Sequence, residues 1–182
     1  MRVIYSPEEF SGRRSVLALG NFDGVHIGHA ALIRRAVDIA GAQGAESVVC
    51  TFDRHPLAVL KPGSEPMELM SLEERLRRFE KLGADWAYVR PFTLALARTP
   101  AEEYLRELIR ALRAVCVVVG ENHRFGRDGG GDAALIRRVC VQMGVRAEIV
   151  PPVSVGGETV SSTRIRRLIA QGEREQAARL LG

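Results

Sequence analysis

Short apolar runs alternate with helical patterns along almost the whole chain, and this alternation constrains the fold more than any other feature. The mostly apolar runs lie at residues 15–19, 47–52, 86–89, 115–119 and 146–150. Continuous apolar runs of this length are typical of strands covered on both faces of a sheet. Strands separated by helices form βαβ units with right-handed crossovers. The sequence therefore predicts a doubly wound α/β fold, with a parallel sheet and helices on both faces.

Local signals mark where the helices between these strands begin and end. Apolar side chains recur at helical spacing over residues 30–40. Ser71 with Glu74 forms a capping box, and Gly83 closes the helix that it starts. The other expected helices span residues 99–112, with Thr99 as N-cap, 132–144, with Asp132 as N-cap, and the pair 163–170 and 173–181.

Length and composition indicate one compact domain over residues 1–182, 46% apolar and 26% charged. No apolar run approaches the roughly 20 residues of a membrane span, and the charged first ten residues do not resemble a secretory signal. We therefore expect a cytoplasmic protein that contacts no membrane. Cys50, Cys116 and Cys140 lie far apart in apolar stretches, so we expect buried free thiols without disulfides or a zinc site.

The formal net charge of +4 is concentrated near the end of the chain. Residues 161–182 hold five Arg and two Glu. A basic pole of this kind suits nucleic acid or a polyanionic small molecule such as a nucleotide, and composition alone leaves both open. Because no aromatic stacking platform accompanies the basic helices, we do not expect nucleic-acid binding.

The loops after the strands are the expected location of a ligand site, because ligands of doubly wound sheets bind beyond the carboxyl ends of the strands. All four histidines, His26, His29, His55 and His123, follow a predicted strand. The glycine-rich segment at residues 126–131 is expected to be a mobile loop over the site.

The most informative loop is residues 20–29, with the sequence Gly-Asn-Phe-Asp-Gly-Val-His-Ile-Gly-His. Its glycines suit a tight turn, and the helix that starts near Gly28 directs free N–H groups toward an anion. The glycine spacing matches neither the dinucleotide-binding pattern nor the P-loop, which disfavours hydride transfer and P-loop phosphoryl transfer. His26 and His29 lie on one side of the first helical turn, where they suit phosphate contacts. A metal role or simple capping is the alternative interpretation of this pair.

Four blocks in order and spacing give the chain a family resemblance. They are Gly20 to His29, Thr51 to Pro56, Gly120 to Gly126 and Ser161 to Arg166. The letters His-Ile-Gly-His also mark class I aminoacyl-tRNA synthetases and related nucleotidyltransferases, but the chain lacks the length and the KMSKS segment of a synthetase. All four blocks together resemble the FMN adenylyltransferase (FAD synthetase) module of bacterial bifunctional riboflavin kinase/FMN adenylyltransferases. The resemblance implies a Rossmann-like HxGH nucleotidyltransferase fold. In the bifunctional proteins a riboflavin kinase domain follows, and the resemblance implies that this domain is absent from residues 1–182. Two alternatives stay open, a protein that takes FMN from a separate kinase and a chain that is a piece of a longer protein.

The resemblance implies that MgATP and FMN are the substrates and that FAD and pyrophosphate are the products. The catalytic residues it implies are His26, His29 and Arg166. The ATP and phosphate contacts it implies are Gly20, Phe22, Asp23, Gly24, Gly28, Ser162 and Thr163. Mg²⁺ is expected to bridge the phosphates with few protein ligands, because this ion keeps much of its water. Asp23 is the one candidate ligand, and a structural role in the turn is its alternative.

The flavin contacts implied by the resemblance are Phe52, His55, Pro56, Asn122 and Phe125. A core role is the alternative for Phe52, which ends an apolar strand. The chain departs from the family at two positions, with His123 in place of an aromatic Phe and Thr93 in place of a frequent Asp. His123 keeps a second hypothesis open, an HxGH nucleotidyltransferase with a different flavin or phosphomonoester acceptor. A non-catalytic module that binds flavin or nucleotide is the third.

Overall fold

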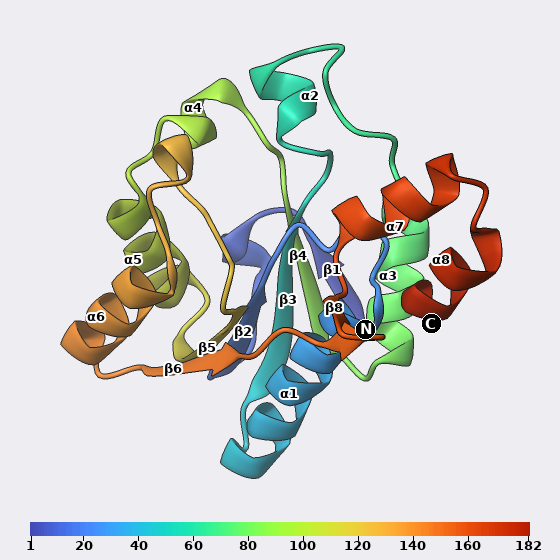
Figure 1. Ribbon diagram of the computed structural model, residues 1–182. Helices are drawn as coiled ribbons and strands as arrows, with labels where there is room; N and C mark the ends of the chain where they lie inside the picture. The colour runs from blue at the N-terminus through green and yellow to red at the C-terminus, as the bar shows by residue number, and fades with distance from the viewer.

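The computed structural model describes all residues 1–182 as a doubly wound α/β domain (Figure 1). Its six-stranded parallel sheet has the order β1-β4-β3-β2-β5-β6. The strands are β1 (Arg2–Ile4), β2 (Ser15–Leu19), β3 (Glu46–Phe52), β4 (Trp86–Arg90), β5 (Ala114–Gly120) and β6 (Arg146–Val150). The five predicted strands and the parallel, doubly wound sheet are therefore confirmed. The short edge strand β1 was not predicted, because three residues carry too little periodicity to identify a strand.

Four helices cover the two faces of the sheet. Helices α1 (Ile27–Gln43) and α3 (Leu72–Lys81) pack on one face, and α5 (Ala101–Ala111) and α6 (Ala133–Met143) pack on the other (Figure 1). Along β2 the side chains alternate between the two faces, as a pleated strand requires. Leu17 belongs to the α5/α6 core, and Val16 and Ala18 belong to the α1/α3 core.

The remaining elements are short and lie around the carboxyl ends of the strands or near the end of the chain. They are η1 (Pro7–Glu9), α2 (Leu57–Leu60), α4 (Leu94–Ala97), η2 (Arg127–Gly129), β7 (Ser154–Val155), β8 (Glu158–Thr159), α7 (Ser162–Ala170) and α8 (Arg174–Leu181). Helices α7 and α8 form a small core of their own around Ile165, Leu168 and Leu180. The predicted final helical pair is confirmed, whereas α2, α4 and the β7/β8 hairpin were not predicted.

Two of the three predicted N-caps are confirmed. Ser71 and Glu74 form the complete capping box of α3, and the Asp132 side chain accepts a hydrogen bond from the Leu135 N–H. The assignment of Thr99 as the N-cap of α5 is wrong. Pro100 is the N-cap and makes no side-chain cap, while the Thr99 hydroxyl donates to the carbonyl of Ala95. Thr99 bonds to the preceding helix α4, which the sequence analysis did not predict, and so does not cap α5.

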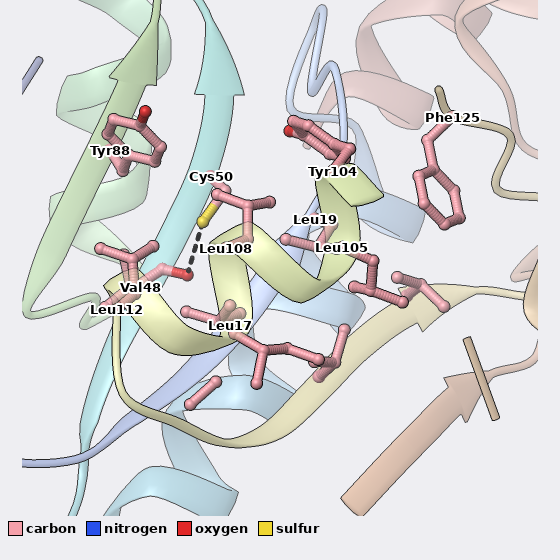
Figure 2. Packing of buried hydrophobic residues seen from close by; sticks show 14 of the residues in the cluster. Leu17, Leu19, Val48, Cys50, Tyr88, Tyr104, Leu105, Leu108, Leu112 and Phe125 are labelled. Carbon is pink, nitrogen blue, oxygen red and sulfur yellow. Dashed lines mark hydrogen bonds between the residues drawn. The ribbon is translucent and has the colours of Figure 1, made fainter. Parts of the chain in front are cut away.

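The larger core lies between the sheet and helices α5 and α6 (Figure 2). Tyr104 and Phe125 lie toward one end of this cluster, and Leu17 and Leu112 lie toward the other. The three cysteines are buried and free, as predicted, and burial raises the pKa of the Cys50 thiol.

The order of the strands places a crevice beside β2. The chain passes from β2 to β3 on one side and returns later to β5 on the other side. At such a reversal the loops after the two neighbouring strands diverge and leave space between them. The loops after β2 and β5 contain residues 20–29 and 120–126, two of the four blocks singled out from the sequence.

Candidate active site

Two adjoining cavities open at the carboxyl ends of the central strands. The histidine cavity has a volume of about 370 Å³ and is lined by the turn after β2, the start of the loop after β5, residues 150–153 and the N-terminus of α7. The aromatic cavity, also about 370 Å³, is lined by the loops after β2, β3, β4 and β5 together with Tyr104 of α5. Both cavities share four wall residues, which are Leu19, Gly20, Asn21 and His123. Both cavities therefore lie at the loops after the strands, where the sequence led us to expect a ligand site.

The turn between β2 and α1 has an unusual backbone. Phe22, Gly24 and Val25 all have positive φ, at 53°, 85° and 37°. Left-handed backbone is unfavourable for a side chain branched at Cβ, such as that of Val25, and it persists only where the surroundings enforce it. Phe22 supplies part of that enforcement, because its fully buried ring packs edge-on against Phe79 and against His29. The turn thus fixes the start of α1 at the cavity wall.

His26 and His29 are brought together by the first turn of α1. His26 is the N-cap, and its Nδ1 accepts the backbone N–H of His29 at 3.2 Å. The two imidazole rings stack with their centroids 3.6 Å apart and their planes at 14°. Gly28 allows this arrangement, since a Cβ there would lie 3.2 Å from the His26 ring. Because Nδ1 of His26 is an acceptor, its proton is on Nε2, which remains the donor available to a ligand.

Burial keeps both stacked imidazoles neutral. Desolvation lowers the pKa of His26 from 6.5 to about 4, against smaller opposing effects of its own backbone and of Asp23. Burial also lowers the pKa of His29 well below its usual value, and a charge on His26 would lower it further. Nδ1 of His29 is buried without a hydrogen-bond partner. The pair therefore offers uncharged donors to an anion.

Asp23 connects the turn to α7. Its Oδ1 accepts the Leu69 N–H at 3.0 Å, and its Oδ2 forms an ion pair with Arg166. The carbonyl of Asp23 accepts the hydroxyl of Ser162 at 2.9 Å. The Arg166 Nε donates to the carbonyl of Met67 at 2.7 Å. Two predicted phosphate contacts, Asp23 and Ser162, and the predicted catalytic residue Arg166 are thus bonded to the protein itself in this structure.

The N-terminus of α7 lines the histidine cavity opposite α1. Ser161 caps the helix by accepting the Arg164 N–H, and Ser162 and Thr163 form part of the cavity wall. The first N–H groups of a helix have no acceptor within it, and they carry the positive end of its dipole. The histidine cavity therefore lies between two helix N-termini, an arrangement suited to a chain of phosphates.

The aromatic cavity is built from residues distant in the sequence. Phe52 after β3 and Phe92 after β4 pack edge-to-face with centroids 5.0 Å apart. Phe125 contacts Tyr104 and is stacked with His123 at 5.5 Å. A cavity with flat apolar walls suits a planar heteroaromatic ring.

The predicted flavin residues divide between several places. Phe52, Pro56 and Phe125 line the aromatic cavity. Asn122 lines the histidine cavity instead. His55 is on the wall of neither cavity, and its Nδ1 accepts the Leu57 N–H at the start of α2. The positions of Asn122 and His55 depend on the conformations of the loops after β5 and β3, which the sequence blocks do not specify.

The predicted phosphate-site glycines also differ in role. Gly20 and Gly28 line the histidine cavity, whereas Gly24 forms the turn behind it, with Leu69 at 3.0 Å from where a Cβ would be. Thr93, the second departure from the family pattern, is the N-cap of α4 and accepts the Leu96 N–H. Threonine and aspartate both cap helices, so either residue could start α4 at this position.

Arg75 is an important residue that the sequence analysis missed. Although 2% exposed, it has no carboxylate partner, and its Nη1 donates to the carbonyls of Asn21 and Phe52 and to the hydroxyl of Thr51 at 3.0–3.1 Å. Burial lowers its pKa. The guanidinium ties the ends of β2 and β3 together behind both cavities. Its position in an amphipathic helix gave no signal, because buried and exposed arginines look alike in a sequence. Phe92 and Tyr104, which line the aromatic cavity, were missed because they lie outside the four sequence blocks.

No group of three or more His, Cys, Asp or Glu side chains is arranged to hold a metal ion. Asp23 is a poor ligand in this arrangement, because both of its carboxylate oxygens are already bonded. None of the helices has the length and hydropathy needed to traverse a lipid bilayer.

Comparison with known proteins identifies related chains. Residues 9–164 match the family described as FAD synthetase. A putative bifunctional riboflavin kinase/FMN adenylyltransferase of Geobacillus thermodenitrificans is 44% identical, with 92% of this chain and 89% of the relative covered. The bifunctional riboflavin kinase/FMN adenylyltransferase of Listeria monocytogenes is 34% identical, with the whole of this chain and 60% of the relative covered.

A solved structure has the same fold over nearly the whole chain. A crystal structure described as a macrolide-efflux protein from Streptococcus pneumoniae superposes with a TM-score of 0.84 at 31% identity, over 99% of this chain and 59% of the other. This chain thus spans about 60% of the length of several of the proteins that it resembles.

Proposed function

The chain belongs to the FAD synthetase family, and from that premise we propose that it transfers the AMP group of MgATP to FMN, giving FAD and pyrophosphate. The observation that carries the proposal is the shared wall of the two cavities. A flavin ring in the aromatic cavity and a triphosphate in the histidine cavity would meet at this wall.

The reaction needs little from the protein except position and charge stabilisation. An oxygen of the FMN phosphate forms a bond to the α-phosphorus of ATP, and the bond from that phosphorus to the bridging oxygen breaks, releasing pyrophosphate. Holding two anions in line supplies a large part of the rate enhancement, and donors aimed at the developing charge supply much of the rest.

His26 and His29 are the proposed donors to the phosphates. As neutral imidazoles they add no charge before ATP binds, and an arriving triphosphate would raise their pKa values by its own negative charge. Both can then donate to oxygens that gain charge as pyrophosphate departs. Their stacking restricts the rings to the orientation set by the His26 cap.

The N-terminus of α7 is the proposed contact for the other side of the triphosphate. The backbone N–H groups of Ser162 and Thr163 and the exposed Thr163 hydroxyl are available to it. Arg166 would join them by exchanging Asp23 for a phosphate, a replacement of one charge-assisted bond by another. Ser162 would act through its backbone while its hydroxyl holds the turn.

Mg²⁺ enters this proposal as part of the substrate MgATP, since no cluster of acidic groups is present to hold the ion. The proposed partners are the substrates ATP and FMN. We also propose that residues 1–182 act as one catalytic domain. We also propose a cytoplasmic location, because three buried free cysteines suit a reducing environment.

The test is FAD formation from FMN and MgATP, followed by chromatography and by assay of pyrophosphate. Riboflavin in place of FMN and a reaction without flavin are the controls. We expect FAD and pyrophosphate in equal amounts when FMN is the flavin, and neither product in the two controls. Folded protein that binds ATP but forms neither product would contradict the proposal.

A second candidate keeps the same chemistry with another phosphomonoester or flavin analogue as acceptor. His123 is the observation that favours it, because this residue changes the wall of the aromatic cavity. Pyrophosphate release from ATP with a modified flavin, but not with FMN, would select this candidate.

A further inference from the structure

His123 lies where the two cavities meet. Of the four residues that line both, Leu19 and Gly20 have no polar side chain. Asn21 and His123 are the polar pair, and they come from opposite sides of the crevice, after β2 and after β5. A ligand that extends from one cavity into the other must pass between them.

The protein holds the His123 ring in place but leaves its nitrogens free. The backbone N–H of His123 donates to the carbonyl of Gly120 at 3.0 Å, which fixes the turn after β5. The ring lies nearly parallel to Phe125, at 14° and 5.5 Å between centroids. Neither ring nitrogen has a hydrogen-bond partner in the protein, although Phe125 and Tyr104 make this a largely apolar environment. Burial lowers its pKa to about 4, so the ring is neutral and offers one donor and one acceptor.

The chemistry of the acceptor decides which part of it lies beside His123. The flat ring of a flavin fits the aromatic walls, and its phosphate must reach the nucleotide in the histidine cavity. The polar chain and phosphate between them therefore cross the shared wall. An aromatic side chain at this position would offer no hydrogen bond to these oxygens.

We propose that His123 is a specificity-determining residue, which hydrogen-bonds the phosphate of the acceptor where the acceptor crosses from the aromatic to the histidine cavity. The inference rests on the proposed function and assigns a role to a residue at which this chain departs from its family. Its consequence is selectivity for a phosphorylated flavin over the same flavin without phosphate.

The experiment compares FMN with riboflavin as ligands of the full chain, by quenching of flavin fluorescence, for the unmodified protein and two variants. His123→Phe keeps a flat ring and removes the hydrogen bond, whereas His123→Gln keeps a donor and an acceptor without the ring. We expect the ratio of the riboflavin Kd to the FMN Kd to fall roughly tenfold in His123→Phe, the scale of one hydrogen bond to a charged group. His123→Gln should retain most of the ratio.

Melting temperatures of both variants report whether the turn stays folded, and the ATP affinity serves as an internal control. A ratio that His123→Phe leaves unchanged, or that both variants lower equally, would overturn the inference. FAD formation by the unmodified protein is measured in parallel. Protein that binds FMN selectively but forms no FAD would overturn the proposed function and leave the role of His123 supported.

Discussion

The two cavities have similar volumes but are assembled in different ways. The histidine cavity is lined by a few stretches of neighbouring residues, two of which are helix N-termini. The aromatic cavity takes one or two side chains from each of several elements, including Phe52, Phe92 and Tyr104. Phosphate recognition depends on local backbone geometry, which a short motif can encode. Recognition of a flat ring depends on walls brought together by tertiary packing.

The largest expected effect separates catalysis from binding. His29→Ala removes a donor that acts on the developing charge, so kcat should fall by roughly 10² to 10³ while the KM for FMN changes little. Steady-state kinetics of FAD formation measure both. Arg137→Ala, on the exposed side of α6, is the matched control. A tenfold rise in the KM for FMN with kcat unchanged would mean that His29 binds FMN. It would contradict the assignment of the histidine cavity to the phosphates of ATP.

Arg75→Met tests whether one buried cation supports both cavities. The variant removes the Arg75 donor from the carbonyl of Phe52 and one of two donors from the carbonyl of Asn21, which keeps the Thr51 hydroxyl. The expected cost is about 2 to 3 kcal/mol in the free energy of unfolding. Affinities for ATP and for FMN should weaken together, because the ends of β2 and β3 both lose their anchor. Urea denaturation and separate binding titrations measure these quantities. Loss of only one affinity would show that the cavities are held independently.

Low pH should lower the stability of the fold through its buried histidines. His26 titrates near pH 4 in the folded state and near 6.5 when unfolded, so between these values the unfolded chain binds more protons. The free energy of unfolding should therefore decrease as pH falls from 6.5 to 4, by up to about 1.4 kcal/mol per pH unit for each such histidine. His29 contributes in the same direction. Urea denaturation at pH 7, 6 and 5 measures it, and constant stability over that range would contradict the neutral stacked pair.

Phe52→Ala should weaken FMN binding by about tenfold and leave ATP binding nearly unchanged. The substitution removes one face of the aromatic cavity and its edge-to-face contact with Phe92. Fluorescence titration with FMN and calorimetry with ATP measure the two affinities. If stability falls by several kcal/mol and FMN affinity does not change, Phe52 is a core residue alone.

The smallest expected effect is that of Ser71→Ala, a substitution outside both cavities that serves as a reference. Ser71→Ala removes the cap of α3 and should lower the free energy of unfolding by about 1 kcal/mol. Activity per folded molecule should stay constant. Reduced kcat in this variant would mean that α3, through Arg75, transmits small stability changes to the site.

Much of the fold could be predicted because its signals are local. Apolar runs identified five strands, and caps such as Ser71 and Asp132 identified helix starts. The site was predictable where one segment supplies it, as for His26 and His29. Thr99 was misassigned and α4 was missed because four-residue helices have almost no periodicity.

The sequence by itself determined the alternation of strands and helices, the parallel sheet and the histidine pair, because each depends on spacing within a few turns. Only the tertiary structure decided that Arg75 is a buried clamp, that Asn122 faces the histidine cavity, and that His123 lies on a wall common to both cavities. These placements depend on contacts between segments that follow or pack against β2, β3 and β5 and that are distant in the sequence. Such contacts produce no periodic pattern within any single segment.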